Sequence, residues 1–112
     1  MTVISKKKPL VTLINVFEVD PPNQEKLIDL LVKATEETMN KFPGFISANI
    51  HRSLDGSKVV NYAQWRSRED FAAMLKNPDA QKHMQEAYQL TKRIDPHLYE
   101  VVYIDHVAEK AA

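Results

Sequence analysis

Two asparagines and a tryptophan are the side chains in this sequence best suited to hold a small organic molecule. Asn61 and Trp65 lie in the run at residues 58–65, and Asn15 lies in an earlier apolar run at residues 10–19. In a β-strand successive side chains point to opposite faces, so Asn61 and Trp65 share one face. Buried amide and indole N–H groups need hydrogen-bond partners, which the oxygen atoms of a flat ligand can supply. We therefore expect these three side chains to converge on a ligand pocket.

Each of the three residues also has a purely structural interpretation when it is taken alone. A tryptophan on a buried strand commonly fills the core, and a buried asparagine commonly bonds to protein groups. Only the convergence of Asn15, Asn61 and Trp65 in one layer favours a pocket.

The sequence offers few other chemical groups. It has no cysteine, and Gly44 and Gly56 are its only glycines, so a thiol nucleophile, a zinc–cysteine site and a glycine-rich phosphate loop are excluded. Acidic and basic residues balance at 15 each, which indicates neither a nucleic-acid partner nor an anionic membrane. The N-terminus has no apolar run long enough for a signal peptide or a membrane span, which predicts a cytoplasmic protein.

The first half of the chain is predicted to form a strand, a helix and a second strand. The first strand covers residues 10–19, and the prolines and asparagine at residues 20–23 end it and begin a helix. That helix runs to about Phe42, where Pro43 and Gly44 end it. The second strand covers residues 45–52.

The next segment is predicted to be a hairpin, because Asp55-Gly56 is a strong turn signal. Placing these two residues at the centre of the turn pairs the strand at residues 45–52 with the strand at residues 58–67. The facing pairs would be Arg52 with Val59, Ile50 with Asn61, Ala48 with Ala63, and Ile46 with Trp65.

The last third of the chain is predicted to form a broken helix and a final strand. Ser67 and Asp70 resemble a capping box at the start of a short helix, and Pro78 begins another. We expect Asp95-Pro96 to close the helical region and residues 98–106 to form the last strand. The inward faces of the helices then add further pocket-lining candidates to Asn15, namely Phe71, Met74, His83 and Met84.

The predicted order β-α-β-β-α-β indicates an α+β domain with a four-stranded antiparallel ferredoxin-like sheet. The domain would span residues 10–106, between a flexible leader at residues 1–9 and a tail at residues 107–112. Its helices can cover only one face of the sheet. Because the other face carries apolar side chains, we expect two sheets to pack face to face in a homodimer.

Three stretches of the sequence resemble the antibiotic biosynthesis monooxygenase family. They are Gly44-Phe45-Ile46-Ser47-Ala48, the turn Asp55-Gly56, and the run from Val59 to Trp65, within a similarity that covers about residues 10–105. The resemblance implies a ferredoxin-like dimeric α/β barrel that oxidises a phenolic polycyclic aromatic with O₂, without flavin, heme or metal. It also implies that Asn61 and Trp65 are the catalytic residues, donating hydrogen bonds to substrate oxygens.

The sequence departs from the family pattern at two pocket positions. Phe71 stands where the family has a tyrosine, and Gln85 stands where it has an arginine. Two alternatives stay open. One is a heme-degrading monooxygenase, in which Asn15 matches an asparagine of the first strand, His83 lies near the position of the histidine ligand, and Met74 replaces a tryptophan. The other is a non-catalytic dimer that binds a small molecule.

Overall fold

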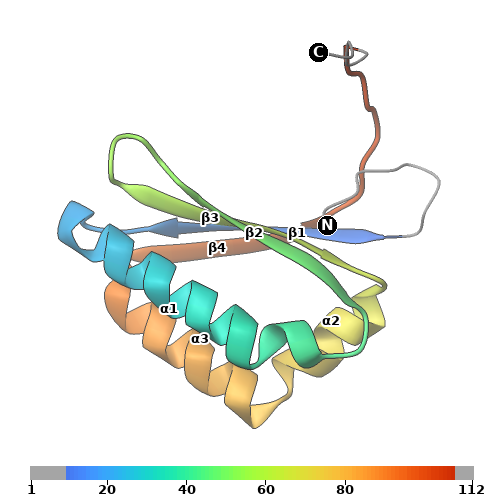
Figure 1. Cartoon of the computed structure of the whole chain (residues 1–112), viewed down its shortest axis with the longest axis horizontal. Helices are drawn as coiled ribbons and strands as arrows, with labels where there is room; N and C mark the ends of the chain where they lie inside the picture. Colours follow the sequence, from blue (N-terminus) through green and yellow to red (C-terminus); the bar gives the residue numbers. More distant parts are fainter. Residues whose placement is uncertain (1–9, 108–112) are drawn as a thin grey trace, which may run out of the picture.

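A computed structural model describes residues 10–107 of the chain as a sheet with one layer of helices beneath it (Figure 1). The elements follow in the order β1 (Val11–Glu18), η1 (Pro21–Asn23), α1 (Gln24–Glu37), η2 (Met39–Lys41), β2 (Phe45–Arg52), β3 (Lys58–Trp65), α2 (Arg68–Leu75), α3 (Pro78–Leu90) and β4 (Arg93–Tyr99). The expected leader at residues 1–9 and most of the expected tail lie outside the described residues.

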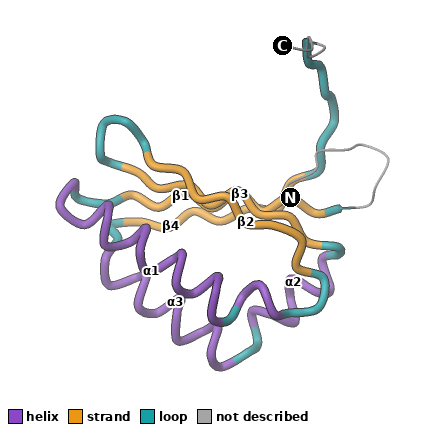
Figure 2. Tube along the Cα trace, viewed as in Figure 1, coloured by secondary structure: helices purple, strands orange, loops and turns teal. Residues whose placement is uncertain are grey.

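The four strands form one antiparallel sheet in the order β2-β3-β1-β4. All of the helices lie against the same face of this sheet, as the tube in Figure 2 shows. The predicted α+β ferredoxin-like arrangement is confirmed. None of the helices in residues 10–107 is long and apolar enough to cross a membrane.

The first helix is shorter than expected, because α1 ends at Glu37 and not near Phe42. Thr38 leaves the helical region with φ −132° and ψ −60°, and the short 3₁₀ helix η2 follows it. At the other end, the buried Gln24 side chain donates hydrogen bonds of 3.0 Å to the carbonyl oxygens of Ser53 and Lys58. This amide ties the start of α1 to the base of the β2–β3 hairpin.

The hairpin register is confirmed from Arg52 to Ala48 but is wrong at the far end. A β-bulge between Phe45 and Ser47 pairs Phe45, and not Ile46, with Trp65. The extra residue in β2 shifts the register by one, so the Phe45 ring comes to lie against Trp65.

The turn of the hairpin is held by an acidic side chain. Asp55 accepts hydrogen bonds from the hydroxyl and the backbone N–H of Ser57, and from the hydroxyl of Ser53. These bonds, chiefly those from Ser57, lower the pKa of Asp55 from 3.8 to about 2.

The helix starts in the second half agree with the prediction. The Ser67 hydroxyl accepts a hydrogen bond from the Asp70 backbone N–H at 3.1 Å, and Asn77 caps α3 through the backbone N–H groups of Asp79 and Ala80. Each cap satisfies N–H groups that the first helical turn leaves without partners.

The last strand is the main error of the sequence-based prediction. β4 occupies Arg93–Tyr99, whereas residues 100–107 form no strand and leave the sheet on its helix-free side (Figure 1). Asp95-Pro96 lies within the strand and does not end the helical region. Proline is tolerated there because β4 is an edge strand, where one row of N–H groups has no sheet partner.

The core lies between the sheet and the helices in two clusters. One contains Phe17, Val19, Leu27, Val59 and Ala87, and the other contains Trp65, Met74 and Ala80. The candidate site lies beside both clusters.

Candidate active site

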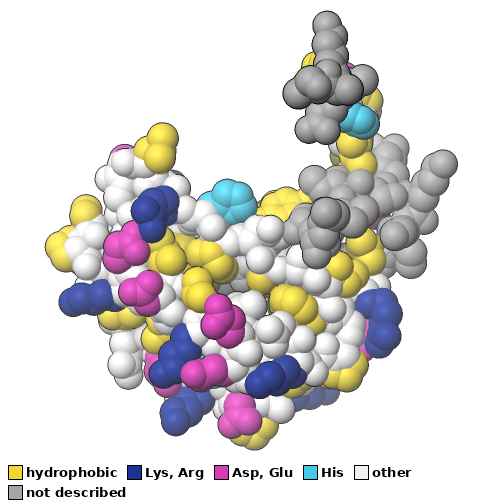
Figure 3. Space-filling model, viewed as in Figure 1, with side chains coloured by type: hydrophobic (Ala, Val, Ile, Leu, Met, Phe, Trp, Pro, Cys, Tyr) yellow, Lys and Arg dark blue, Asp and Glu magenta, His cyan; other side chains and the backbone are white. Residues whose placement is uncertain are grey.

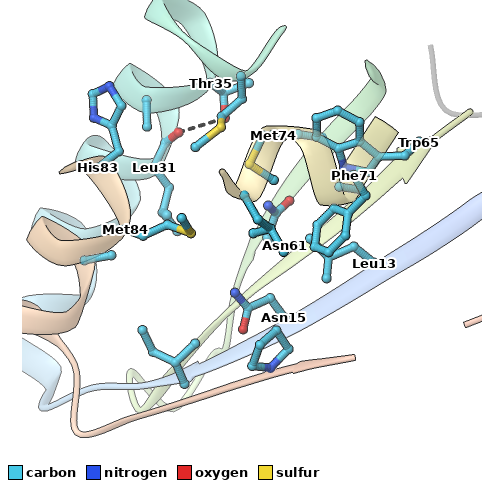
Figure 4. Close-up of a pocket in the computed structure, with 18 of the residues that line it drawn as sticks. Leu13, Asn15, Leu31, Thr35, Asn61, Trp65, Phe71, Met74, His83 and Met84 are labelled. Carbon is cyan, nitrogen blue, oxygen red and sulfur yellow. Dashed lines mark hydrogen bonds between the residues drawn. The ribbon is translucent and has the colours of Figure 1, made fainter. Parts of the chain in front are cut away.

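A cavity of about 380 Å³ opens between the helical layer and the sheet (Figure 4). Every residue predicted to belong to the site lines it: Asn15, Asn61, Trp65, Phe71, Met74, His83 and Met84. The other predicted outcome, a layer filled by aliphatic side chains with both asparagines bonded to main-chain groups, is not observed. The convergence of the two amides and the indole on one cavity is thus present in the structure.

Asn15 and Asn61 form a cross-strand pair. Asn15 of β1 lies directly opposite Asn61 of β3 in the register of the sheet, and both side chains point toward the helices (Figure 4). The Oδ1 atoms of both residues are buried and have no hydrogen-bond partner within residues 10–107. Buried amides are normally satisfied, so two orphaned acceptors side by side indicate that a ligand completes the site.

The aromatic wall of the cavity is built around Trp65, which is only 2% exposed. Its ring makes edge-to-face contacts with Phe45, at 5.6 Å between ring centroids, and with Phe71, at 5.9 Å. Trp65 therefore has a structural role as well as a place in the cavity wall. A catalytic role for Trp65 stays a prediction.

The helical wall of the cavity is mostly apolar. Met39, Met74 and Met84 contribute flexible, polarizable thioethers, which adapt well to the face of an aromatic ring. The Thr35 hydroxyl donates to the carbonyl oxygen of Leu31 at 2.8 Å, within its own helix. The cavity offers no carboxylate from the described part of the chain.

His83 lines the cavity, but its ring turns away from the two asparagines (Figure 4). Its Nε2 atom lies 3.0 Å from the hydroxyl oxygen of Thr38, which links α3 to the end of α1. His83 is half-buried and so lies at the edge of the cavity.

Sequence reasoning missed the part of the cavity that β4 provides. Ile94, Pro96 and Leu98 line it, because they alternate along the strand on the helix-covered face. The alternation of apolar residues at positions 94, 96 and 98 could have indicated this strand, but Pro96 was interpreted as the end of the helical region. Gln85, by contrast, is exposed and does not line the cavity.

The comparison with known proteins identifies the family. The model of the family described as antibiotic biosynthesis monooxygenase matches residues 10–86. Tetracenomycin-F1 monooxygenase of Streptomyces glaucescens is 52% identical over 83 residues, which cover 74% of this chain and 74% of that protein. The chain belongs to the antibiotic biosynthesis monooxygenase family.

Solved structures of the antibiotic biosynthesis monooxygenase type have the same fold. A monooxygenase from the gene ActVA-Orf6 of Streptomyces coelicolor, solved with the ligand nanaomycin D, aligns with a TM-score of 0.80 and 27% identity over 93% of this chain and 96% of that chain. SnoaB, a cofactor-independent oxygenase from Streptomyces nogalater, aligns with a TM-score of 0.71 and 22% identity over 86% of this chain and 96% of that chain.

The heme alternative fits the cavity poorly. It requires a free imidazole nitrogen in the cavity, whereas Nε2 of His83 faces the Thr38 hydroxyl and Nε2 of His97, the other histidine that lines the cavity, lies 2.8 Å from Oδ1 of Asp95. In residues 10–107 no three histidine or carboxylate side chains cluster in a way that could hold a metal ion.

Proposed function

We propose that this protein is a cofactor-independent monooxygenase that oxidises a phenolic polycyclic aromatic, of the anthrone or hydroquinone type, with O₂. The observation that carries the proposal is the apolar cavity of about 380 Å³ with two unpartnered amide oxygens, Oδ1 of Asn15 and Oδ1 of Asn61, at its sheet side. Membership of the family supports the reaction class, and the aromatic and thioether walls support a flat aromatic substrate.

The proposed reaction converts a ring methylene into a ketone: R₂CH₂ + O₂ gives R₂C=O + H₂O. Loss of one C–H proton gives an electron-rich carbanion whose charge lies largely on the neighbouring phenolate or enolate oxygen. One electron passes to O₂, and the two radicals combine to form a C–O bond and a peroxide. Loss of the second C–H proton then breaks the O–O bond, and water leaves.

The protein would stabilise the negative charge of the carbanion and exclude bulk water from the cavity. In this proposal the amide N–H groups of Asn61 and Asn15, which line the cavity side by side, would donate to a developing oxyanion; this is the type of contact that commonly contributes most to catalysis. The apolar wall around Trp65 and Phe71 would keep bulk water away from the carbanion and the peroxide.

The proposal is tested by incubating the purified protein with an anthrone in air and under argon. We expect O₂-dependent formation of the anthraquinone at a rate well above that in buffer, with one oxygen atom of ¹⁸O₂ entering the product. Prior treatment with a metal chelator should leave the rate unchanged. A rate equal to that in buffer would overturn the proposal, and saturable binding without turnover would then support the non-catalytic alternative.

We also propose that a second copy of the chain covers the helix-free face of the sheet. Ile14, Val16, Val60 and Tyr62 lie on that face and are only half-buried, and the arm formed by residues 100–107 projects from the same side (Figure 1). Within this arm Val102, Tyr103 and Val107 are 69%, 75% and 90% exposed. An apolar face and an apolar arm on the same side favour burial against a partner subunit.

The helical layer, on the side away from the proposed partner, carries charges of both signs. Figure 3 shows acidic and basic side chains intermixed over the helical layer, with no large area of one sign on the face in view. Light scattering should give about twice the chain mass of 12.9 kDa. A stop codon after Glu100 should shift the protein toward the monomer, and a monomeric mass for the full chain would contradict the proposal.

A further inference from the structure

We infer that the thioethers of Met74 and Met84 form a modification site, at which a peroxide inside the cavity transfers one oxygen atom to methionine sulfur and leaves methionine sulfoxide. The inference rests on the proposed function for a peroxide that forms inside the cavity. For an apolar peroxide added from outside, it rests on the cavity alone.

Methionine is concentrated at this cavity. The sequence has four methionines, and three of them, Met39, Met74 and Met84, line the cavity. Because the sequence has no cysteine, these thioethers supply all of the sulfur at the cavity wall. A thioether is oxidised by peroxides to the sulfoxide, whereas the hydrocarbon and amide groups that make up most of the wall are not.

Met74 and Met84 approach the cavity from two different helices. Met74 belongs to α2 and Met84 belongs to α3. Figure 4 shows both side chains extending from their helices toward the part of the cavity where Asn61 lies. In the proposed reaction the oxyanion would be bound at Asn61, so the peroxide would form close to the same place. The two thioethers are therefore the sulfur groups that face the proposed peroxide.

The burial of Met74 makes its oxidation depend on the route that the peroxide takes. Met74 is only 5% exposed and belongs to the core cluster with Trp65 and Ala80. A peroxide in bulk water is therefore screened from this sulfur, whereas a peroxide in the cavity meets it directly. Met84 is half-buried in the cavity wall. Oxidation from the cavity should thus select residues that exposure to solvent would not select.

The oxygen transfer balances without any further reactant. In the proposed reaction the peroxide R₂CH–OOH loses its C–H proton and then breaks its O–O bond to give the ketone. Attack of the thioether on the outer oxygen breaks the same bond in another way: R₂CH–OOH + R′SCH₃ gives R₂CHOH + R′S(O)CH₃. Sulfur gives up two electrons, the O–O bond accepts them, and the inner oxygen takes the hydroperoxide proton. The sulfoxide is polar, so part of the apolar wall would become polar.

The first experiment needs no turnover and compares cumene hydroperoxide, which is apolar, with hydrogen peroxide. Peptide mass spectrometry measures the sulfoxide fraction at each methionine. Leu54→Met provides the matched control, because Leu54 is fully exposed in the loop between β2 and β3 and the new thioether would meet only solvent.

We expect Met74 and Met84 to favour cumene hydroperoxide over hydrogen peroxide about tenfold more than the control thioether does, because an apolar cavity favours the apolar oxidant. Unfolding the protein in urea should remove this difference. An equal preference at the cavity and control thioethers of the folded protein would overturn the inference.

The second experiment follows the modification during turnover of an anthrone under ¹⁸O₂, with catalase present to remove free hydrogen peroxide. We expect ¹⁸O-labelled sulfoxide at Met74 and Met84 in proportion to the product formed, and no label at the thioether introduced by Leu54→Met. Label at the control thioether equal to that at the cavity would overturn the inference, because it would show that the oxidant acts from solution.

The outcomes separate this inference from the proposed function. Oxidation of the anthrone without label at either methionine would overturn the modification site and leave the monooxygenase reaction standing. If the anthrone is not oxidised, the proposed function fails, and the comparison of the two added peroxides alone decides whether the cavity directs oxidation to Met74 and Met84.

Discussion

Replacing Asn61 by leucine should make the folded protein more stable and remove its activity. Leucine has nearly the shape of asparagine but no polar atoms. In the free protein the Oδ1 atom of Asn61 is buried without a hydrogen-bond partner, and such a group costs about 1–3 kcal/mol of folding free energy. Its removal should therefore raise the free energy of unfolding by about 1–2 kcal/mol. For a domain of this size that corresponds to a rise in Tm of roughly 4–10 °C.

The activity of the same variant should change in the opposite direction. Loss of one donor to a developing oxyanion lowers kcat by about 100-fold or more. Urea unfolding gives the stability, and anthrone-dependent O₂ uptake gives the activity. Destabilisation by Asn61→Leu would refute the reasoning, because it would mean that the amide is already satisfied in the free protein.

Ser47 provides a matched control for this experiment. Its hydroxyl oxygen is also buried without a partner, but the residue does not line the cavity. Ser47→Ala should therefore stabilise the fold in the same way and leave the O₂ uptake unchanged. Loss of activity in this variant would show that stability and activity are linked by something other than the cavity amides.

Three further predictions concern the fold that positions the site. Gly44→Ala should destabilise the protein by about 1–3 kcal/mol in urea unfolding, because φ is +84° and the new methyl group would collide with the Asp70 carboxyl group. Gly56→Ala, with φ +81° but only an ordinary contact of 3.5 Å with Pro21, should cost less. Gln24→Leu should cost about 2 kcal/mol in the same assay, because it removes two hydrogen bonds that tie α1 to the hairpin; the carbonyl oxygens of Ser53 and Lys58 keep one backbone N–H donor each. The pKa of Asp55 is lowered from 3.8 to about 2, so its stabilising effect is complete above about pH 4 and is lost between pH 4 and 2. The urea midpoint of Asp55→Asn should therefore change less with pH in that window than the midpoint of the unchanged protein. An equal change with pH in the two proteins would contradict this.

The face assignment could be predicted from the sequence because it depends only on alternation. A strand places every second side chain on one face wherever its ends lie, so Asn15, Asn61 and Trp65 were correctly assigned to one layer. The hairpin centre was also correct, because Asp55-Gly56 defines it locally. These features need no knowledge of the tertiary contacts.

The errors arose where tertiary context overrides local signals. Pro96 was expected to end the helical region, but it lies in the edge strand β4, whose unpaired side tolerates proline. The bulge between Phe45 and Ser47 leaves no clear mark in the sequence, since it contains neither glycine nor proline. The cavity itself could not be predicted, because its volume depends on how the helical side chains pack over small residues such as Ala34 and Ala63.

The polar groups that line the cavity determine which charges of the proposed reaction the protein can stabilise. An apolar cavity disfavours a carbanion or an oxyanion relative to water, so the walls alone would slow the loss of the proton. No carboxylate from residues 10–107 lines the cavity, and each of its two histidines bonds elsewhere: Nε2 of His83 lies beside the Thr38 hydroxyl, and Nε2 of His97 lies 2.8 Å from Oδ1 of Asp95. The amides of Asn15 and Asn61 are then the groups that would offset the loss of solvation, through their N–H groups. Their Oδ1 atoms have no partner within residues 10–107, so no hydrogen bond at these oxygens holds the amides in one orientation. The same lack of partners at Oδ1 that weakens the fold would let the amides turn their N–H groups toward the substrate.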